Sequence, residues 1–183
     1  MKAKTVRNHP VSKQNYGGNK MKKRTKNLTL AAVIASMYAV ITIFLTYSMS
    51  YQASQFRVAE ALTILPFFTP TGIYGLFVGC IIANILSPVG PLDVIFGSLA
   101  TLIGALMTYY IGKSNLRFKK YIAPLPPVII NAIVIGFLLY YTAKWPLFIT
   151  MLQVGLGELL SCYGLGLPLL LVIEKNKELQ EIF

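Results

Sequence analysis

The feature that most constrains this chain is an uncharged apolar run from residue 28 to residue 48. Its 21 residues include no Asp, Glu, Lys or Arg, and as an α-helix they would measure about 31 Å. A helix of about 20 apolar residues crosses the hydrocarbon core of a bilayer. Basic residues precede the run, as in a signal peptide, but no small-residue cleavage site follows it and further apolar segments do. The run is therefore predicted to be a first transmembrane helix.

Five more apolar segments follow, and the composition agrees with a membrane protein. The chain of 183 residues is 55% hydrophobic and 13% charged, whereas soluble domains carry about 25% charged residues. We predict an all-α integral membrane protein, a compact bundle of six transmembrane helices within a membrane domain of residues 28–173. The predicted helices are 28–48, 58–70, 72–88, 93–112, 125–142 and 147–172. The second is the weakest as a span, because it is short and carries Pro66 and Pro70 near its end.

The distribution of basic residues predicts the orientation of this bundle. Nine of the seventeen Lys and Arg residues precede Asn27, so residues 1–27 are predicted to be a basic, unstructured cytoplasmic tail and not a nucleic-acid-binding arm. Six crossings return the basic segment 113–124 to the cytoplasm, whereas five would place it outside. We therefore favour six spans with both termini in the cytoplasm, and residues 174–183 as a cytoplasmic C-terminal tail.

Three carboxylates belong to the predicted spans: Glu60, Asp93 and Glu158. A charge within a membrane span costs about 2.5–3.5 kcal/mol on insertion scales, so such residues usually face the bundle interior or a cavity. Their positions along the helices predict that all three line one pocket open to the outside. The other predicted pocket residues are Gln52, Arg57, Asn84, Asn131, Trp145 and Gln153.

Purely structural roles are open for several of these side chains. Arg57 and Glu60 are three residues apart and could form a local ion pair at a helix end. Asp93 could satisfy the free N–H groups of a helix start, and Trp145 could anchor the membrane interface. Glu158 has no cation near it in the sequence, which favours a ligand or proton role.

The motifs that are missing point away from an enzyme. The chain has no GxxxxGK[ST] phosphate-binding loop and no GxSxG or HExxH motif. Cys80 and Cys162 lie in apolar segments and are predicted to be buried free thiols. The one histidine, His9, lies in the basic tail, so neither a metal site nor a cofactor is expected in this chain.

Small residues form a strip along the first predicted helix. Ala31, Ala35 and Ala39 recur every four residues and share one face, which lets another helix approach closely. The spacing is compatible with internal packing of the bundle and with docking of a partner membrane protein.

Several stretches resemble one transporter family. The segments FRVAEALTILPFFTPTGIYGLFVGCIIANIL, PLDVIFGSLATLIGAL and APLPPVIINAIVIG are similar to the queuosine-precursor transporter (QueT) family, and the similarity runs from about Leu28 to Ile173. Members of that family are the substrate-binding S components of energy-coupling factor (ECF) transporters. The resemblance implies capture of a 7-deazaguanine, such as 7-aminomethyl-7-deazaguanine or queuine, from outside the cell. Delivery would follow by toppling of the S component in the plasma membrane.

The same resemblance implies partner proteins. These are a transmembrane T component, on which Ala31, Ala35 and Ala39 would dock, and two ATPase subunits that use the ATP. An S component for another vitamin or purine-like compound is a second interpretation. A small secondary carrier or channel that uses its intramembrane carboxylates is a third.

Overall fold

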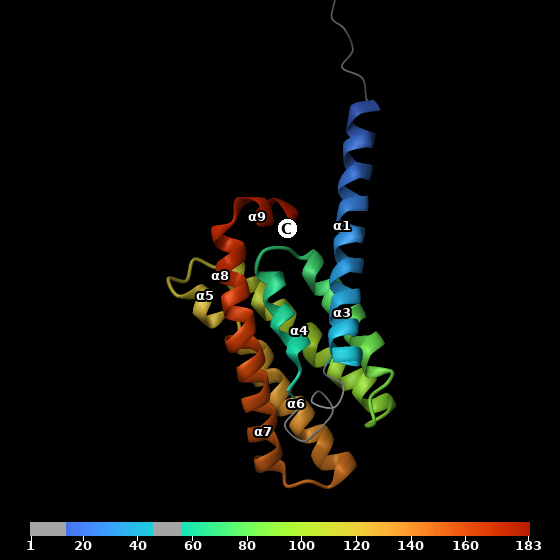
Figure 1. Ribbon diagram of the computed structural model, residues 1–183, viewed down its shortest axis with the longest axis vertical. Coiled ribbons are helices and arrows are strands. Elements are labelled where there is room, and N and C mark those ends of the chain that lie inside the picture. The colour runs from blue at the N-terminus through green and yellow to red at the C-terminus, as the bar shows by residue number, and fades with distance from the viewer. Residues whose placement is uncertain (1–13, 46–55) are drawn as a thin grey trace, which may run out of the picture.

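The computed structural model describes residues 14–45 and 56–183, and within these ranges the backbone forms helices and the turns that join them (Figure 1). The elements in chain order are α1 (Gln14–Val40), η1 (Ile41–Leu45), η2 (Val58–Phe67), α3 (Thr71–Asn84), η3 (Asp93–Gly97), α4 (Ser98–Lys113), α5 (Lys119–Ile122), α6 (Leu125–Ala143), α7 (Leu147–Leu159), η4 (Leu160–Gly166), α8 (Leu167–Lys175) and α9 (Lys177–Ile182). The predicted all-helical class is therefore confirmed.

Four continuous helices of the described chain are long and apolar enough to cross a membrane. They span Met21–Phe44, Asp93–Lys113, Lys119–Ala143 and Leu147–Lys175. The second and third predicted segments form the shorter apolar helices η2 and α3, so six full crossings stay a prediction. Helix α1 begins at Gln14 and not near residue 28. Lys and Arg favour helices, and the long apolar helix that follows lets the residues before it continue in the same conformation.

The short helix η2 lies at the centre of the bundle. It is a 3-10 helix of ten residues in which residues 59–66 are all buried. A 3-10 helix rises about 2.0 Å per residue against 1.5 Å in an α-helix, so ten residues cover about 20 Å. A helix that is apolar all round suits a buried position. Other helices, and not lipid, surround this segment. It therefore does not need the length of a full membrane span, which is why its sequence predicts only a weak one.

Helices α1 and α3 approach each other closely at two glycines. A Cβ added at Gly75 would lie 2.8 Å from the carbonyl oxygen of Ala31, and one added at Gly79 would lie 2.8 Å from that of Ala35. Ala35 and Ala39 are themselves buried. In this conformation the alanine strip therefore serves internal packing, and its docking role stays a proposal.

The basic segments gather at one end of the molecule (Figure 1). Lys26 Nζ donates a hydrogen bond to the carbonyl oxygen of Glu181 at 2.6 Å, and Lys120 Nζ lies 2.7 Å from Glu174 Oε2. The N-terminal half of α1, the α4–α5 connection and α9 thus lie toward one end, and the α6–α7 turn lies at the other. The shared end agrees with the predicted topology, while the side of the membrane that it faces stays a prediction.

Candidate functional site

Polar side chains form a buried cluster where η2 meets the surrounding helices. None of them is more than 7% exposed. We call this group the buried polar cluster, and its members are Tyr38, Arg57, Glu60, Thr63, Cys80, Asn84, Ser87, Asp93, Thr101, Asn131, Glu158 and Cys162. Polar groups in the membrane interior are costly unless they are paired and often mark a substrate or ion pathway.

An ion pair holds one side of the cluster. Arg57 Nη2 lies 3.2 Å from Asp93 Oδ2, and Ser87 Oγ donates to the same oxygen at 2.6 Å. Arg57 Nη1 also donates to Asn84 Oδ1 at 3.4 Å, while Asn84 Nδ2 donates to the backbone carbonyl of Asp93 at 3.1 Å. These bonds join the residue before η2 to the first residue of η3.

This arrangement differs from the two local alternatives that the sequence left open. Arg57 forms its ion pair with Asp93 and not with the neighbouring Glu60. Asp93 does not cap a helix through its side chain, because the N-cap residue of η3 is Leu92 and the Asp93 carboxylate faces Arg57 and Ser87. Arg57 and Asp93 are 36 positions apart, so spacing along the chain could not predict their ion pair.

Glu60 is held by one of its two carboxylate oxygens. Tyr38 Oη donates to Glu60 Oε1 at 2.5 Å, and Thr101 Oγ1 donates to it at 3.4 Å. Oε2 is buried and has no hydrogen-bond partner among the described residues, and the same holds for Oδ1 of Asp93. An unpaired buried polar atom costs about 1–3 kcal/mol. Such atoms therefore call for an explanation, and an N–H donor from a ligand is one.

Glu158 joins the cluster from the opposite side. It lies near the end of α7, where its side chain interacts with Asn131 of α6. Cys162 Sγ lies 3.9 Å from Glu158 Oε2 and 3.6 Å from the backbone carbonyl of Glu60. Thr63 Oγ1 lies 3.7 Å from the same sulfur. Glu60, Asp93 and Glu158 thus belong to one buried group, although they come from three separate parts of the chain.

The cluster is closed in this conformation. Glu60 is 0% exposed, and Asp93 and Glu158 are each 1% exposed, so the three side chains are shielded from the surroundings in this conformation. A pocket that opens to the outside stays a prediction.

Irregular helical geometry accompanies the cluster. Asp93 lies in the π-helical segment η3, Cys162 in the π-helical segment η4, and Glu60 in the 3-10 helix η2. Short π-helical segments occur often at functional sites. Within a membrane, irregular backbone is tolerated where protein buries it or where it lines a cavity. The irregular helical segments therefore lie in the same region as the buried polar cluster.

The remaining predicted site residues lie elsewhere. Gln153 is exposed on α7, and Trp145 is partly buried at the α6–α7 turn, where it packs against the apolar cluster that contains Leu139. Gln153 lies on the exposed face of α7, and Trp145 lies in the turn between α6 and α7. Neither residue therefore joins the buried polar cluster. Gln52 lies outside the described residues.

Sequence reasoning missed several members of the cluster. Tyr38 and Thr101 were not singled out, since a hydroxyl in an apolar helix carries little signal until its partner is known. Cys80 and Cys162 are confirmed as buried free cysteines. Their sulfurs lie within the polar cluster: Cys80 Sγ is 3.3 Å from both Asn84 Nδ2 and Thr101 Oγ1.

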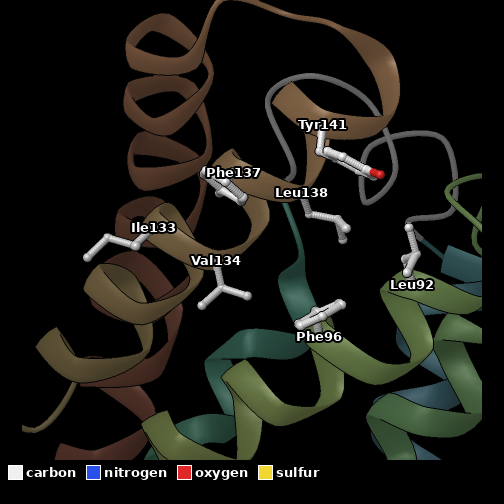
Figure 2. Close-up of a pocket in the computed structure, with 7 residues that line it drawn as sticks. All are labelled: Leu92, Phe96, Ile133, Val134, Phe137, Leu138 and Tyr141. Atoms are coloured by element: carbon white, nitrogen blue, oxygen red, sulfur yellow. The ribbon is translucent and has the colours of Figure 1, made fainter.

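A separate apolar cavity lies near the cluster. Figure 2 shows Leu92 and Phe96 on one side of this pocket and side chains of α6 on the other. Its volume is about 460 Å³. The lining residues are Leu92, Phe96, Ile133, Val134, Phe137, Leu138 and Tyr141. Its apolar walls suit lipid chains and not a polar ligand. The described residues contain no group of three or more side chains suited to hold a metal ion.

Long apolar helices around a buried polar cluster are typical of a membrane protein with a substrate or ion pathway. The comparison with known sequences identifies the group more closely. The chain belongs to the QueT transporter family, whose sequence model matches residues 28–175. It is 30% identical over 154 residues to the queuosine precursor transporter QueT of Lactococcus lactis subsp. cremoris (strain MG1363), covering 78% of this chain and 89% of that protein. No solved structure matches the chain.

Proposed function

We propose that this protein is the substrate-binding S component of an ECF importer in the plasma membrane. It captures a 7-deazaguanine precursor of queuosine, such as 7-aminomethyl-7-deazaguanine or queuine, from outside the cell. Support for this class comes from membership of the QueT transporter family over residues 28–175. The name of the Lactococcus lactis relative supports the choice of substrate.

The observation that carries the ligand class is that Glu60 Oε2 has no hydrogen-bond partner among the residues that the structure describes. A guanine-type ring presents neighbouring N–H donors along one edge, and a carboxylate accepts such donors with high strength. The cluster holds three carboxyl groups and one guanidinium, so carboxyl groups outnumber cationic side chains in it. Such a site favours a donor-rich or cationic molecule, and an aminomethyl-deazaguanine is both.

The proposed delivery step depends on partner proteins. The loaded S component topples on a transmembrane T component, and two ATPase subunits supply energy from ATP. Docking through the alanine strip requires α1 and α3 to separate, since Ala35 and Ala39 are buried against the bundle. An Ala35→Trp variant tests this step: loss of the complex with the T component supports docking. A variant that still forms the complex would contradict the docking role of the strip.

A binding panel tests the substrate. The isolated chain has one tryptophan, Trp145, so its fluorescence, checked by calorimetry, can report binding. The ligands are 7-aminomethyl-7-deazaguanine, queuine, guanine, thiamine and riboflavin. We expect tight binding of a deazaguanine, whereas tight binding of another ligand without a response to either deazaguanine would refute the substrate assignment.

A secondary carrier is the second candidate, and the three buried carboxylates favour it. Such a protein would accumulate substrate in proteoliposomes without other subunits. An S component would require the T component, the ATPases and ATP. Uptake by the chain alone would therefore contradict the S component role.

A further inference from the structure

We infer that Tyr38 is a positioning residue that orients Glu60 for the ligand and ties the packing of α1 to the binding site. The inference rests on the proposed function, because it takes Glu60 as a ligand-binding residue. Helix α1 contributes Tyr38 to the buried polar cluster, and the side chain of Tyr38 is 0% exposed.

The hydrogen bonds of Glu60 give Tyr38 this role. Tyr38 Oη donates to Glu60 Oε1 at 2.5 Å, and the more distant Thr101 Oγ1 donates to the same oxygen at 3.4 Å. Two donors on one oxygen restrict rotation of the carboxylate, so Oε2 is presented in one direction. The bond from Tyr38 is shorter than the bond from Thr101, and short hydrogen bonds to carboxylates are the strong ones. Tyr38 is therefore the stronger restraint on Glu60.

The position of Tyr38 depends in turn on the contact between α1 and α3. A Cβ added at Gly79 would lie 2.9 Å from Tyr38 Cβ and 2.8 Å from the carbonyl oxygen of Ala35. Only the bare backbone of Gly79 lets the two helices come this close. Tyr38 Oη also lies 3.5 Å from Cys80 Sγ, the residue next to that glycine.

A displacement of α1 therefore reaches the ligand through Tyr38. Movement of α1 away from α3 would draw Oη from Glu60 and free the carboxylate to rotate. If a partner protein engages α1, as proposed above, the same contact would loosen the hold on the ligand at the moment of delivery. Tyr38 would then link docking to release.

The first test removes the hydroxyl and keeps the ring. Tyr38→Phe should weaken binding of the deazaguanine about 10- to 100-fold, as expected for loss of a hydrogen bond to a charged group. Tyr109→Phe is the control, because Tyr109 is a partly buried tyrosine of α4 outside the cluster, and its affinity should match the wild type. In a Glu60→Gln background the Tyr38→Phe change should add little, since residues that act through one another are not additive. Independent, additive losses would mean a structural role only.

The second test uses two matched glycines. Gly79→Ala and Gly75→Ala each place a Cβ 2.8 Å from a carbonyl oxygen of α1, but only the Cβ at residue 79 meets Tyr38. We expect Gly79→Ala to lose at least fivefold more affinity than Gly75→Ala, at similar losses of thermal stability. Equal losses of affinity would overturn the tie between α1 and the site. Should either variant fail to fold, the Tyr38→Phe measurement decides the inference.

The outcomes separate this inference from the function that it rests on. A wild-type chain that binds no deazaguanine refutes the proposed function. A wild-type chain that binds it, with Tyr38→Phe unchanged in affinity, refutes the role of Tyr38 alone.

Discussion

The guanidinium of Arg57 lies 3.2 Å from the carboxylate of Asp93, and this ion pair joins two residues 36 positions apart in the interior of the bundle. The side chains are 3% and 1% exposed. Removing one partner of a buried pair leaves the other charge without compensation, which costs more than the pair itself contributes. The pair therefore links the residue before η2 to the first residue of η3.

Asp93→Asn should destabilise the protein by about 3–5 kcal/mol, because it removes the buried carboxylate that pairs with the Arg57 guanidinium. Thermal unfolding in detergent measures the change. Adding Arg57→Met to this variant should recover part of the loss. An Asp93→Asn variant as stable as the wild type would show that the pair is dispensable.

Gly97→Ala should also destabilise the cluster. A Cβ at this position would lie 2.6 Å from Asp93 Oδ1 and 2.8 Å from Asn84 Nδ2, so both polar side chains must shift. Overpacking of this kind costs about 1–3 kcal/mol. Gly164→Ala is the matched control, since a Cβ there would meet no atom within 4 Å. Equal thermal stability of the two variants would contradict the tight fit around Gly97.

Glu158→Gln should weaken ligand binding and leave membrane insertion intact. The change keeps the shape of the side chain and replaces the carboxyl group near Asn131 and Cys162 by an amide. Loss of a charged hydrogen bond is worth about 1.5–3 kcal/mol, or roughly 10- to 100-fold in affinity, which calorimetry measures. Gln153→Ala, on the exposed surface of α7, should bind as the wild type does. Unchanged affinity in Glu158→Gln would remove this residue from the site.

The two cysteines should report opening of the cluster. Cys80 is 0% exposed and Cys162 is 1% exposed, so alkylation by a maleimide should be slow in the folded protein and complete after denaturation, because a buried thiol is inert. A bound deazaguanine should slow the reaction further if it stabilises the closed state. Mass spectrometry of the labelled chain follows the rate. Rapid labelling of both thiols without denaturant would show that the cluster is open in solution.

Labelling of introduced cysteines tests the orientation. Arg117→Cys lies in the basic α4–α5 connection and Ala143→Cys at the α6–α7 turn, and both positions are exposed. An impermeant maleimide should label residue 143 in intact cells and residue 117 only after permeabilisation, as the positive-inside rule requires. The reverse pattern would place the basic end outside.

Local signals in the chain were sufficient for the class of protein and the positions of most helices. Uncharged runs of about 20 residues have few stable alternatives to membrane helices, because lipid offers no hydrogen bonds to an open backbone. Helix η2 was harder, since a short apolar segment has the same composition whether lipid or protein surrounds it. The start of α1 at Gln14 was missed because helix can propagate into a polar flank once the apolar part has formed.

Sequence alone placed Glu60, Asp93 and Glu158 within apolar segments of a membrane protein, because charge and hydrophobicity are properties of the residues and their neighbours. Only the tertiary structure decided which partners they have. Arg57 pairs with Asp93 and not with nearby Glu60, and Glu60 accepts its hydrogen bond from Tyr38. These contacts depend on how closely helices approach and which faces they turn to one another. Gly75 and Gly79 permit the close approach of α1 and α3, and only the folded chain identifies them as the glycines that do so.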